Sequence, residues 1–151
     1  MKRVLVWLGG IFLGLVLLGG LLFGYVAIFV GPPLDASSKA YIDQNIPIIV
    51  SSWSTDELVN RSSPELLAVA NKEQMNQLLK KLSALGKLKQ YLGCKGDSNI
   101  MFNIGSPNAI TAQYISEADF ENGHAQITTR LIQRDGKWQI MYFYVFSVPM
   151  W

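Results

Sequence analysis

The sequence predicts an α+β fold, with helices in the first half of the chain and an antiparallel sheet in the second. In the first half, apolar residues recur at helical spacing between capping residues. In the second half, apolar and polar residues alternate in segments rich in β-branched and aromatic residues. Two dipeptides typical of tight hairpins, Asn122-Gly123 and Asp135-Gly136, separate these segments. The chain is therefore expected to pack its helices on one face of a β-meander.

An uncharged segment, 4–30, precedes this domain and predicts one transmembrane helix. Its 27 residues would extend about 40 Å as a helix, more than the roughly 30 Å of a bilayer's hydrocarbon core. Because Lys2 and Arg3 belong on the cytoplasmic side, the domain is expected outside the cytoplasm. The expected organisation is a cytoplasmic tail at 1–3, the membrane helix at 4–30, a linker at 31–34 and the extracytoplasmic domain at 35–151.

Four glycines of this segment, Gly10, Gly14, Gly20 and Gly24, form two GxxxG patterns. At 100° per residue they fall within an arc of roughly 120°, so one helix face would let a second helix approach closely. The pattern therefore predicts packing against a second copy of the chain or another membrane protein. Glycine is also frequent in membrane helices in general, so ordinary composition is the alternative.

Composition argues against several functions of the domain. Of the 13 lysines and arginines, Lys2 and Arg3 precede residue 35, which leaves eleven basic residues against eleven acidic ones. A neutral domain has no bulk attraction to nucleic acid, so no nucleic-acid partner is expected. The single cysteine, Cys94, rules out an intrachain disulfide, and with a single histidine it offers no Cys/His metal centre. No metal or cofactor is predicted, and Cys94 is expected to be a small buried side chain.

The longest helix is expected to begin at Asp35 or Ser37, either of which can cap a helix, and to bend at Pro47. Its apolar positions are Tyr41, Ile42, Ile46, Ile49 and Trp53.

Two shorter helices follow. Ser63 and Pro64 form a cap followed by a first-turn proline, which predicts a helix that ends near Val69. Asn71 caps the next helix, which Gly86 ends. The apolar stripe of that helix comprises Met75, Leu78, Leu79, Leu82 and Leu85.

Five strands are expected after Gly86: 88–94, 99–104, 109–120, 124–134 and 138–148. If the Asn-Gly and Asp-Gly pairs each form a two-residue type I′ turn, then Phe120 opposes Ala125, and Thr129 opposes Tyr142. This register assigns every side chain of the long strands to a face. The predicted core face comprises Tyr114, Ala118, Phe120, Ala125, Ile127, Leu131, Trp138, Ile140, Tyr142, Tyr144 and Phe146. The opposite face is polar except for Ile115, Met141, Phe143 and Val145.

A family resemblance rests on three sequence segments. They are Ala112-Gln113-Tyr114, Asp119-Phe120-Glu121-Asn122-Gly123-His124-Ala125 and Asp135-Gly136-Lys137-Trp138-Gln139-Ile140. Preceded by helices, they resemble the nuclear-transport-factor-2-like, cystatin-like cone superfamily, and in particular small bacterial envelope proteins of uncharacterised function. The resemblance covers roughly residues 35–151. It implies a curved meander around N-terminal helices, and a bacterial inner-membrane protein whose domain is periplasmic or extracellular. The superfamily hosts isomerases, dehydratases, binding domains and secretion-system subunits, so it selects no activity.

Enzymes of this superfamily carry an acid/base residue inside the cone. The predicted core face offers only neutral polar groups, and Asp43 on the first helix is the remaining carboxylate candidate. His124 follows a turn and is interpreted as a surface residue. No catalytic residue is predicted, and the protein is predicted not to be an enzyme. An isomerase- or cyclase-like enzyme remains an alternative.

Two functions fit this sequence better. One is an accessory or scaffold protein that forms a homodimer or joins a membrane complex, through a surface comprising Ile115, Arg130, Met141, Phe143 and Val145. The other is binding of a small apolar ligand or lipid inside the cone, in a pocket lined by Tyr114, Trp138, Tyr142, Tyr144 and Phe146. The same five side chains would equally form a packed core.

Overall fold

The structure is a computed structural model that describes residues 2–25, 28–29, 31–101 and 109–149. The chain divides into two compact units, Met1–Leu34 and Asp35–Trp151. The first unit contains helix α1 (Lys2–Tyr25). Within the described residues, no helix combines the length and the hydropathy that a membrane span requires. The transmembrane helix therefore stays a prediction from the sequence, and part of its expected C-terminal end, residues 26–27 and 30, lies outside the described residues.

Three of the four glycines singled out above lie in α1 with free space around them. A Cβ atom added to Gly14, Gly20 or Gly24 would meet no other heavy atom within 4 Å. These positions therefore stay open to the close approach of another helix. Gly10 belongs to the same helix, but its surroundings lie outside the described residues.

Helix α2 (Gly31–Ser52) starts earlier than predicted. The expected linker, 31–34, forms its first residues, so the prediction of a cap at Asp35 or Ser37 is wrong. Proline is compatible with a first helical turn because the amide hydrogen it lacks has no partner there. Pro47 lies inside the helix, as expected.

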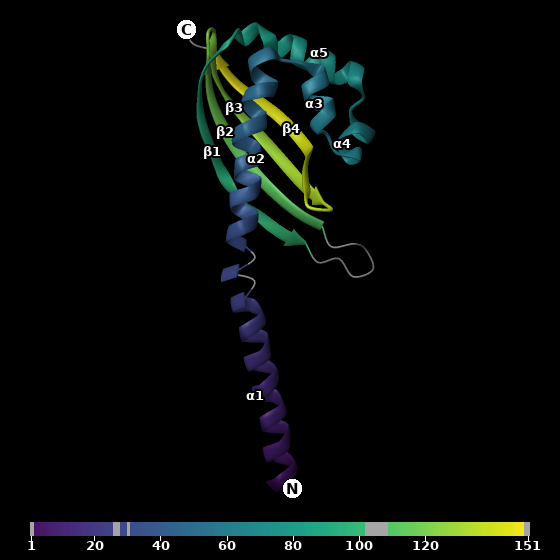
Figure 1. Ribbon diagram of the computed structural model, residues 1–151, viewed down its shortest axis with the longest axis vertical. Coiled ribbons are helices and arrows are strands. Elements are labelled where there is room, and N and C mark those ends of the chain that lie inside the picture. Colours follow the sequence, from purple (N-terminus) through teal and green to yellow (C-terminus); the bar gives the residue numbers. More distant parts are fainter. Residues whose placement is uncertain (1, 26–27, 30, 102–108, 150–151) are drawn as a thin grey trace. The chain divides into compact units, whose positions relative to one another are not determined.

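The second unit has an α+β fold, as the sequence predicts. Its four strands are β1 (Leu88–Met101), β2 (Ala109–Phe120), β3 (Gly123–Arg134) and β4 (Lys137–Pro149). They form one open antiparallel sheet in the order β1-β2-β3-β4, which is a meander. Figure 1 shows α2 crossing this sheet, with the shorter helices gathered beyond β4 and over the end of the sheet. We call the helix-covered face of the sheet the inner face and the opposite one the outer face.

Three short helices connect α2 to the sheet. They are α3 (Thr55–Arg61), α4 (Pro64–Val69) and α5 (Lys72–Leu82), the last followed by a 3-10 turn (Ser83–Leu85). The caps predicted at Ser63 and Asn71 are confirmed, and Asn71 forms a reciprocal capping box with Gln74. Helix α3 was missed, although Ser54 and Glu57 provide the Ser-x-x-Glu signal of a helix start.

The core lies between α2 and the inner face. Ile42, Ile46 and Ile49 recur at helical spacing and are fully buried. They share the core with side chains of the sheet that have little or no exposure: Tyr114, Ala118, Phe120, Ala125, Ile127, Leu131 and Ile140. The inner face is therefore filled by packed side chains.

The predicted turn at Asn122-Gly123 is one residue out of place. Phe120 pairs with Gly123, so the turn residues are Glu121 and Asn122. Tertiary contacts explain the difference, because the backbone N–H of Glu121 donates to Lys87 O and that of Asn122 to Leu85 O, at 3.0 and 2.9 Å. The register moves by two positions, so every β2 and β3 side chain keeps its predicted face. The second turn is as predicted, with positive φ at Asp135 (50°) and Gly136 (74°).

A β-bulge in β4 overturns part of the face assignment. Leu131 pairs with Ile140 and Arg130 with Tyr142, so Met141 has no partner and is the extra residue. Beyond it, every side chain of β4 points to the face opposite to the predicted one. Phe143 is 9% exposed on the inner face, whereas Tyr144 is 52% exposed on the outer face.

Strand β1 is continuous where two strands were predicted. It runs through residues 95–98, and residues 102–104 of the second predicted strand lie outside the described residues. Gly96 makes this continuity possible, because a Cβ atom there would collide with the backbone carbonyl of Gln113. Gly93 adopts a positive φ of 96° beside one of two register irregularities in this strand.

Candidate functional site

The outer face carries three rows of side chains that cross all four strands. The first row is Asp97, Gln113, Arg130 and Tyr142, the second is Lys95, Ile115, Thr128 and Tyr144, and the third is Gly93, Glu117, Gln126 and Phe146. Every β4 position in these rows is aromatic. The other positions of these rows include two basic residues, Lys95 and Arg130, and two acidic residues, Asp97 and Glu117, so the three rows carry no net charge.

We call Tyr142, Tyr144 and Phe146 the β4 aromatic stripe. Their exposed fractions are 42%, 52% and 54%, and that of Ile115, two strands away in the row of Tyr144, is 43%. Alternate residues of a strand share one face, so the stripe is continuous along β4. Large aromatic side chains exposed side by side are unusual on a soluble surface and typically mark an interaction site.

The stripe differs from both sets of site residues predicted from the sequence. Tyr142, Tyr144 and Phe146 were expected to line a ligand pocket with Tyr114 and Trp138, but the bulge puts them on the opposite face. They cannot share an internal pocket with those two residues.

The predicted interaction surface is corrected in the same way. Ile115 and Arg130 lie exposed on the outer face, as expected. Phe143 is buried, and Met141 and Val145 are only partly exposed. The three aromatic residues replace them as the apolar part of the surface.

Arg130 holds one end of the stripe in place. Its Nε donates to Gln113 Oε1 at 2.9 Å, and its guanidinium lies 5.4 Å from the centre of the Tyr142 ring. This is a cation–π arrangement, which orients the ring, and Tyr142 is still 42% exposed.

Tyr114 and Trp138 have structural hydrogen bonds on the inner face. The Tyr114 hydroxyl lies 2.8 Å from Ser38 Oγ, and it donates to Asp35 O at 3.2 Å. Trp138 Nε1 donates to Ser37 Oγ at 3.1 Å. Both side chains are at least nine-tenths buried. Their polar atoms thus join the sheet to the start of the α2 segment, and their rings fill the core.

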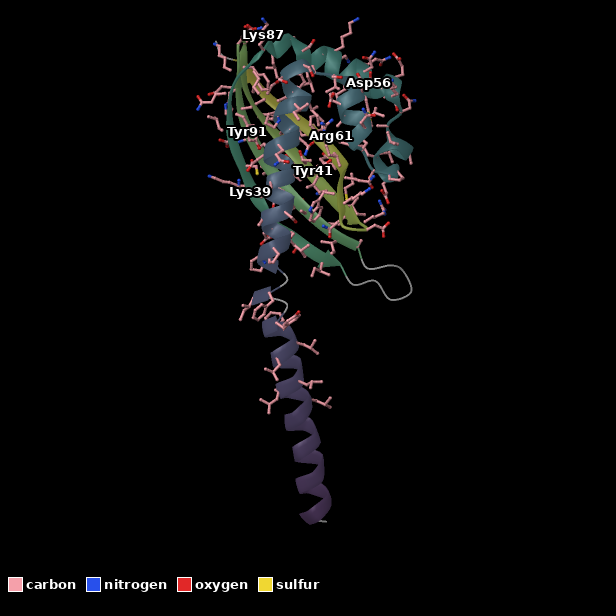
Figure 2. All side chains as sticks on the ribbon, in the orientation of Figure 1. Lys39, Tyr41, Asp56, Arg61, Lys87 and Tyr91 are labelled. Carbon is pink, nitrogen blue, oxygen red and sulfur yellow. The ribbon has the colours of Figure 1, made fainter. Side chains whose placement is uncertain are left out.

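A polar cluster lies between α2 and β1. The Asp43 carboxylate accepts hydrogen bonds from Lys39 Nζ (2.6 Å), the Tyr91 hydroxyl (3.0 Å) and the Cys94 thiol (3.3 Å). The Tyr91 oxygen also lies 3.2 Å from Ser116 Oγ. Figure 2 shows Lys39 and Tyr91 on the β1 side of α2. The cluster therefore brings four ionisable side chains together.

The pKa values of the groups in this cluster lie far from pH 7. Burial alone would raise the pKa of the Asp43 carboxyl, but hydrogen bonds from Lys39, Cys94 and Tyr91 outweigh it, and the pKa lies below its usual value. Burial, and then the Asp43 carboxylate, raise the pKa of the Cys94 thiol to about 11. Burial also raises the pKa of Tyr91, and the hydrogen bond to Asp43 raises that of Lys39. At pH 7 the carboxylate is ionised, whereas the thiol, phenol and ammonium keep their protons.

A cavity of about 400 Å³ lies beside β1. Its walls include Lys39, Leu92, Cys94, Lys95, Ile115 and Glu117. The volume is in the range of small-molecule sites, and the walls mix two ammonium groups, one carboxylate and two aliphatic side chains. The cavity is distinct from the cone interior where a ligand was predicted.

The other candidate residues have ordinary surroundings. His124 Nδ1 lies 2.7 Å from Asp119 Oδ1 in the neighbouring strand, and both side chains are partly exposed. Among the described residues, no group of three or more His, Cys, Asp and Glu side chains could hold a metal ion.

Sequence reasoning missed the partners of Asp43 and the composition of the stripe. Tyr91 and Cys94 come 48 and 51 residues after Asp43, so only the packing of α2 on β1 brings them together. Residues 140–146 are apolar at every position, so the sequence does not specify which of them face outward, and it could signal only that this assignment was ambiguous.

No protein-family model matches the chain, and a search of curated proteins finds no match. The resemblance to the cone superfamily therefore stays a prediction from the residues.

Proposed function

We propose that this protein is a single-pass, membrane-anchored accessory or scaffold protein, which acts by assembly through the outer face of its extracytoplasmic domain. The observation that carries the proposal is the exposure of the β4 aromatic stripe in three rows of side chains that carry no net charge. Aromatic side chains supply much of the energy of protein interfaces, and charged residues are depleted in interface centres. Partners are therefore a second copy of the chain or another membrane protein.

Support for the anchor comes from the chain before Asp35. Segment 4–30 is free of charge, and the exposed fractions of large apolar residues in α1 include 64% for Leu15, 72% for Leu21 and 79% for Phe23. Apolar side chains exposed around a helix are stabilised by lipid rather than by water. With Lys2 and Arg3 at the cytoplasmic side, the domain belongs in the periplasm, or outside a cell with one membrane.

Binding of a small apolar ligand or lipid is the second candidate function. The packed inner face gives little support to a ligand inside the cone. The cavity beside β1 favours this alternative instead, because Leu92 and Ile115 in its walls are 46% and 43% exposed.

An isomerase- or cyclase-like activity has less support. Proton transfer near neutrality needs a group whose pKa lies near the working pH. In the polar cluster the pKa of Asp43 is lowered and that of Cys94 is raised to about 11, so neither exchanges a proton readily at pH 7.

The proposal is tested on the full chain in its membrane. Chemical crosslinking and native mass spectrometry are applied to the wild type, to a Tyr144→Ser/Phe146→Ser variant and to a Gln90→Ser variant, whose change lies at an exposed position of β1 away from the stripe. We expect the wild type and the glutamine variant to form a reproducible complex, and the aromatic variant to lose at least about tenfold of it.

Two other results would contradict the proposal. A monomer without reproducible partner in the wild type removes assembly as its function. A monomer that carries the added mass of a small molecule transfers support to the ligand-binding alternative.

A further inference from the structure

The free edge of β4 carries backbone groups that can pair with a strand of another chain. β4 is the last strand of an open four-stranded sheet, so one row of its N–H and C=O groups has no neighbouring strand. At its start this edge is covered, since Ser62 bridges to Ile140 and the Ser63 N–H donates to Ile140 O at 2.7 Å. Among the described residues, no backbone hydrogen bond from another element reaches the edge after Ile140.

The opposite edge of the sheet is protected. β1 contains two register irregularities and two glycines with positive φ, Gly93 and Gly96. Its Ser98 N–H donates to Asp35 Oδ1 at 2.7 Å, which uses a backbone donor of the edge. Lysines in this strand, Lys89 and Lys95, also oppose the approach of a second strand. Bulges, charges and side-chain caps are the devices by which natural sheets prevent edge-to-edge pairing.

Between its bulge and Pro149, β4 lacks these devices. Residues 142–148 contain no charged residue, no glycine and no proline, and most are β-branched or aromatic. Such a segment has a high tendency to pair with another strand. The contrast between the two edges indicates that β4 pairs with a strand from outside the chain.

Resting on the proposed function, we propose that this strand is β4 of a second copy of the protein. The two β4 strands run antiparallel across a two-fold axis perpendicular to the sheet, and they join two four-stranded sheets into one. A two-fold axis brings each segment against its own equivalent, so a second copy fits only if the segment is compatible with itself. Any charge near the axis would then face its own equivalent, and residues 142–148 carry none.

Symmetry also determines which side chains meet. Directly opposite residues of antiparallel strands share a face, so the outer residues of one β4 oppose outer residues of the other. The two aromatic stripes therefore become neighbours, and Phe143 opposes inner residues of its partner strand. Cross-strand aromatic contacts stabilise such a pair. The charges in the three rows, with Arg130 and Lys95 balanced by Glu117 and Asp97, sum to zero and do not repel the second copy.

A charge-exchange experiment on the full chain in its membrane tests this pairing. Tyr144→Lys and Tyr144→Glu are each produced alone and then together, with crosslinked dimer as the readout. Each variant alone places like charges near the axis, and we expect about a tenfold loss of dimer. Together they place opposite charges there, and the mixed dimer is expected to recover. Gln90→Lys and Gln90→Glu, at an exposed position of β1 away from β4, serve as controls that leave the dimer unchanged.

Single cysteines distinguish edge pairing from stacking of two outer faces. In a Cys94→Ser background, cysteines are placed at Tyr142, Tyr144, Phe146 or Ile115 and oxidised alone and in pairwise mixtures. Opposite residues of paired strands are about 4.5–5.5 Å apart, which a disulfide can bridge. We expect crosslinks between β4 positions and none at Ile115.

The outcomes separate this inference from the proposed function. Crosslinks at Ile115 that equal those at β4 overturn edge pairing but leave assembly through the outer face intact. Loss of the complex in both Tyr144 variants without recovery in the mixture shows a partner other than a second copy, and also overturns the inference. A wild-type chain that stays monomeric overturns both.

Discussion

At the scale of single residues, three hydrogen bonds to the Asp43 carboxylate determine the chemistry of Cys94 as well as that of Asp43. The carboxylate accepts a hydrogen bond from the thiol at an S···O distance of 3.3 Å, and its charge opposes thiolate formation. Cys94 was predicted to be a small buried side chain, and it is partly buried with a polar partner. Its type and position were evident in the sequence, but its partner lies on α2 and is brought close by folding alone.

Replacing Asp43→Asn is expected to make Cys94 more reactive. The amide retains a hydrogen-bond acceptor but removes the negative charge, so the thiol pKa falls from its value of about 11. Below that pKa, each unit of decrease raises the thiolate fraction, and with it the alkylation rate, about tenfold. Iodoacetamide alkylation between pH 7 and 9 measures this rate. Asp97→Asn, another acid-to-amide change near Cys94 in β1, is the control, and an equal increase there would contradict a specific role of Asp43.

The same carboxylate affects acid stability. Its pKa in the folded protein lies below its usual value, so its contribution to stability is present above pH about 4 and is lost as pH falls through the folded-state pKa. The Asn variant lacks this part of the pH dependence. Unfolding midpoints in urea at pH 7 and pH 3 should therefore lie closer together in the variant than in the wild type.

At the scale of elements, the chain's local signals predicted most helices and strands, but not the faces of β4. Two-residue turns and alternation placed the ends of β2, β3 and β4 within one residue of their observed positions. Met141 then changes the face of everything after it. A bulge is invisible where consecutive residues are all apolar, because either set of side chains satisfies the pattern. Packing selects Phe143 for the core and leaves the larger tyrosines outside.

Two alanine substitutions in β4 test which side chains of this strand lie in the core. Phe143→Ala should lower the free energy of unfolding by about 3–5 kcal/mol, because the ring is nine-tenths buried and its removal leaves a cavity. Tyr142→Ala should cost about 1 kcal/mol or less, mainly from the lost contact with Arg130. Urea unfolding of the detergent-solubilised chain gives both values. The reverse order of the two costs would restore the face assignment predicted from the sequence.

At the scale of the whole molecule, composition alone separates the chain into two chemically different parts. Every acidic residue lies at or after Asp35, and the second compact unit begins at that residue. The α+β class followed from the change of periodicity between the halves. The composition of the outer face and the free edge of β4 could not follow from the sequence, because the first depends on one unpaired residue and the second depends on strand order.

The anchor predicts the side of the membrane on which this second unit lies. In the proposed anchor, Lys2 and Arg3 are the only charged side chains before Asp35, so they are expected to set the orientation. In a bacterial host, protease added to spheroplasts should digest a C-terminal epitope, and inverted membrane vesicles should protect it. Lys2→Gln/Arg3→Gln removes the positive charge and should increase the fraction of chains with a protected epitope in spheroplasts. Protection in wild-type spheroplasts together with digestion in inverted vesicles would show the opposite orientation, and would put the aromatic stripe in the cytoplasm.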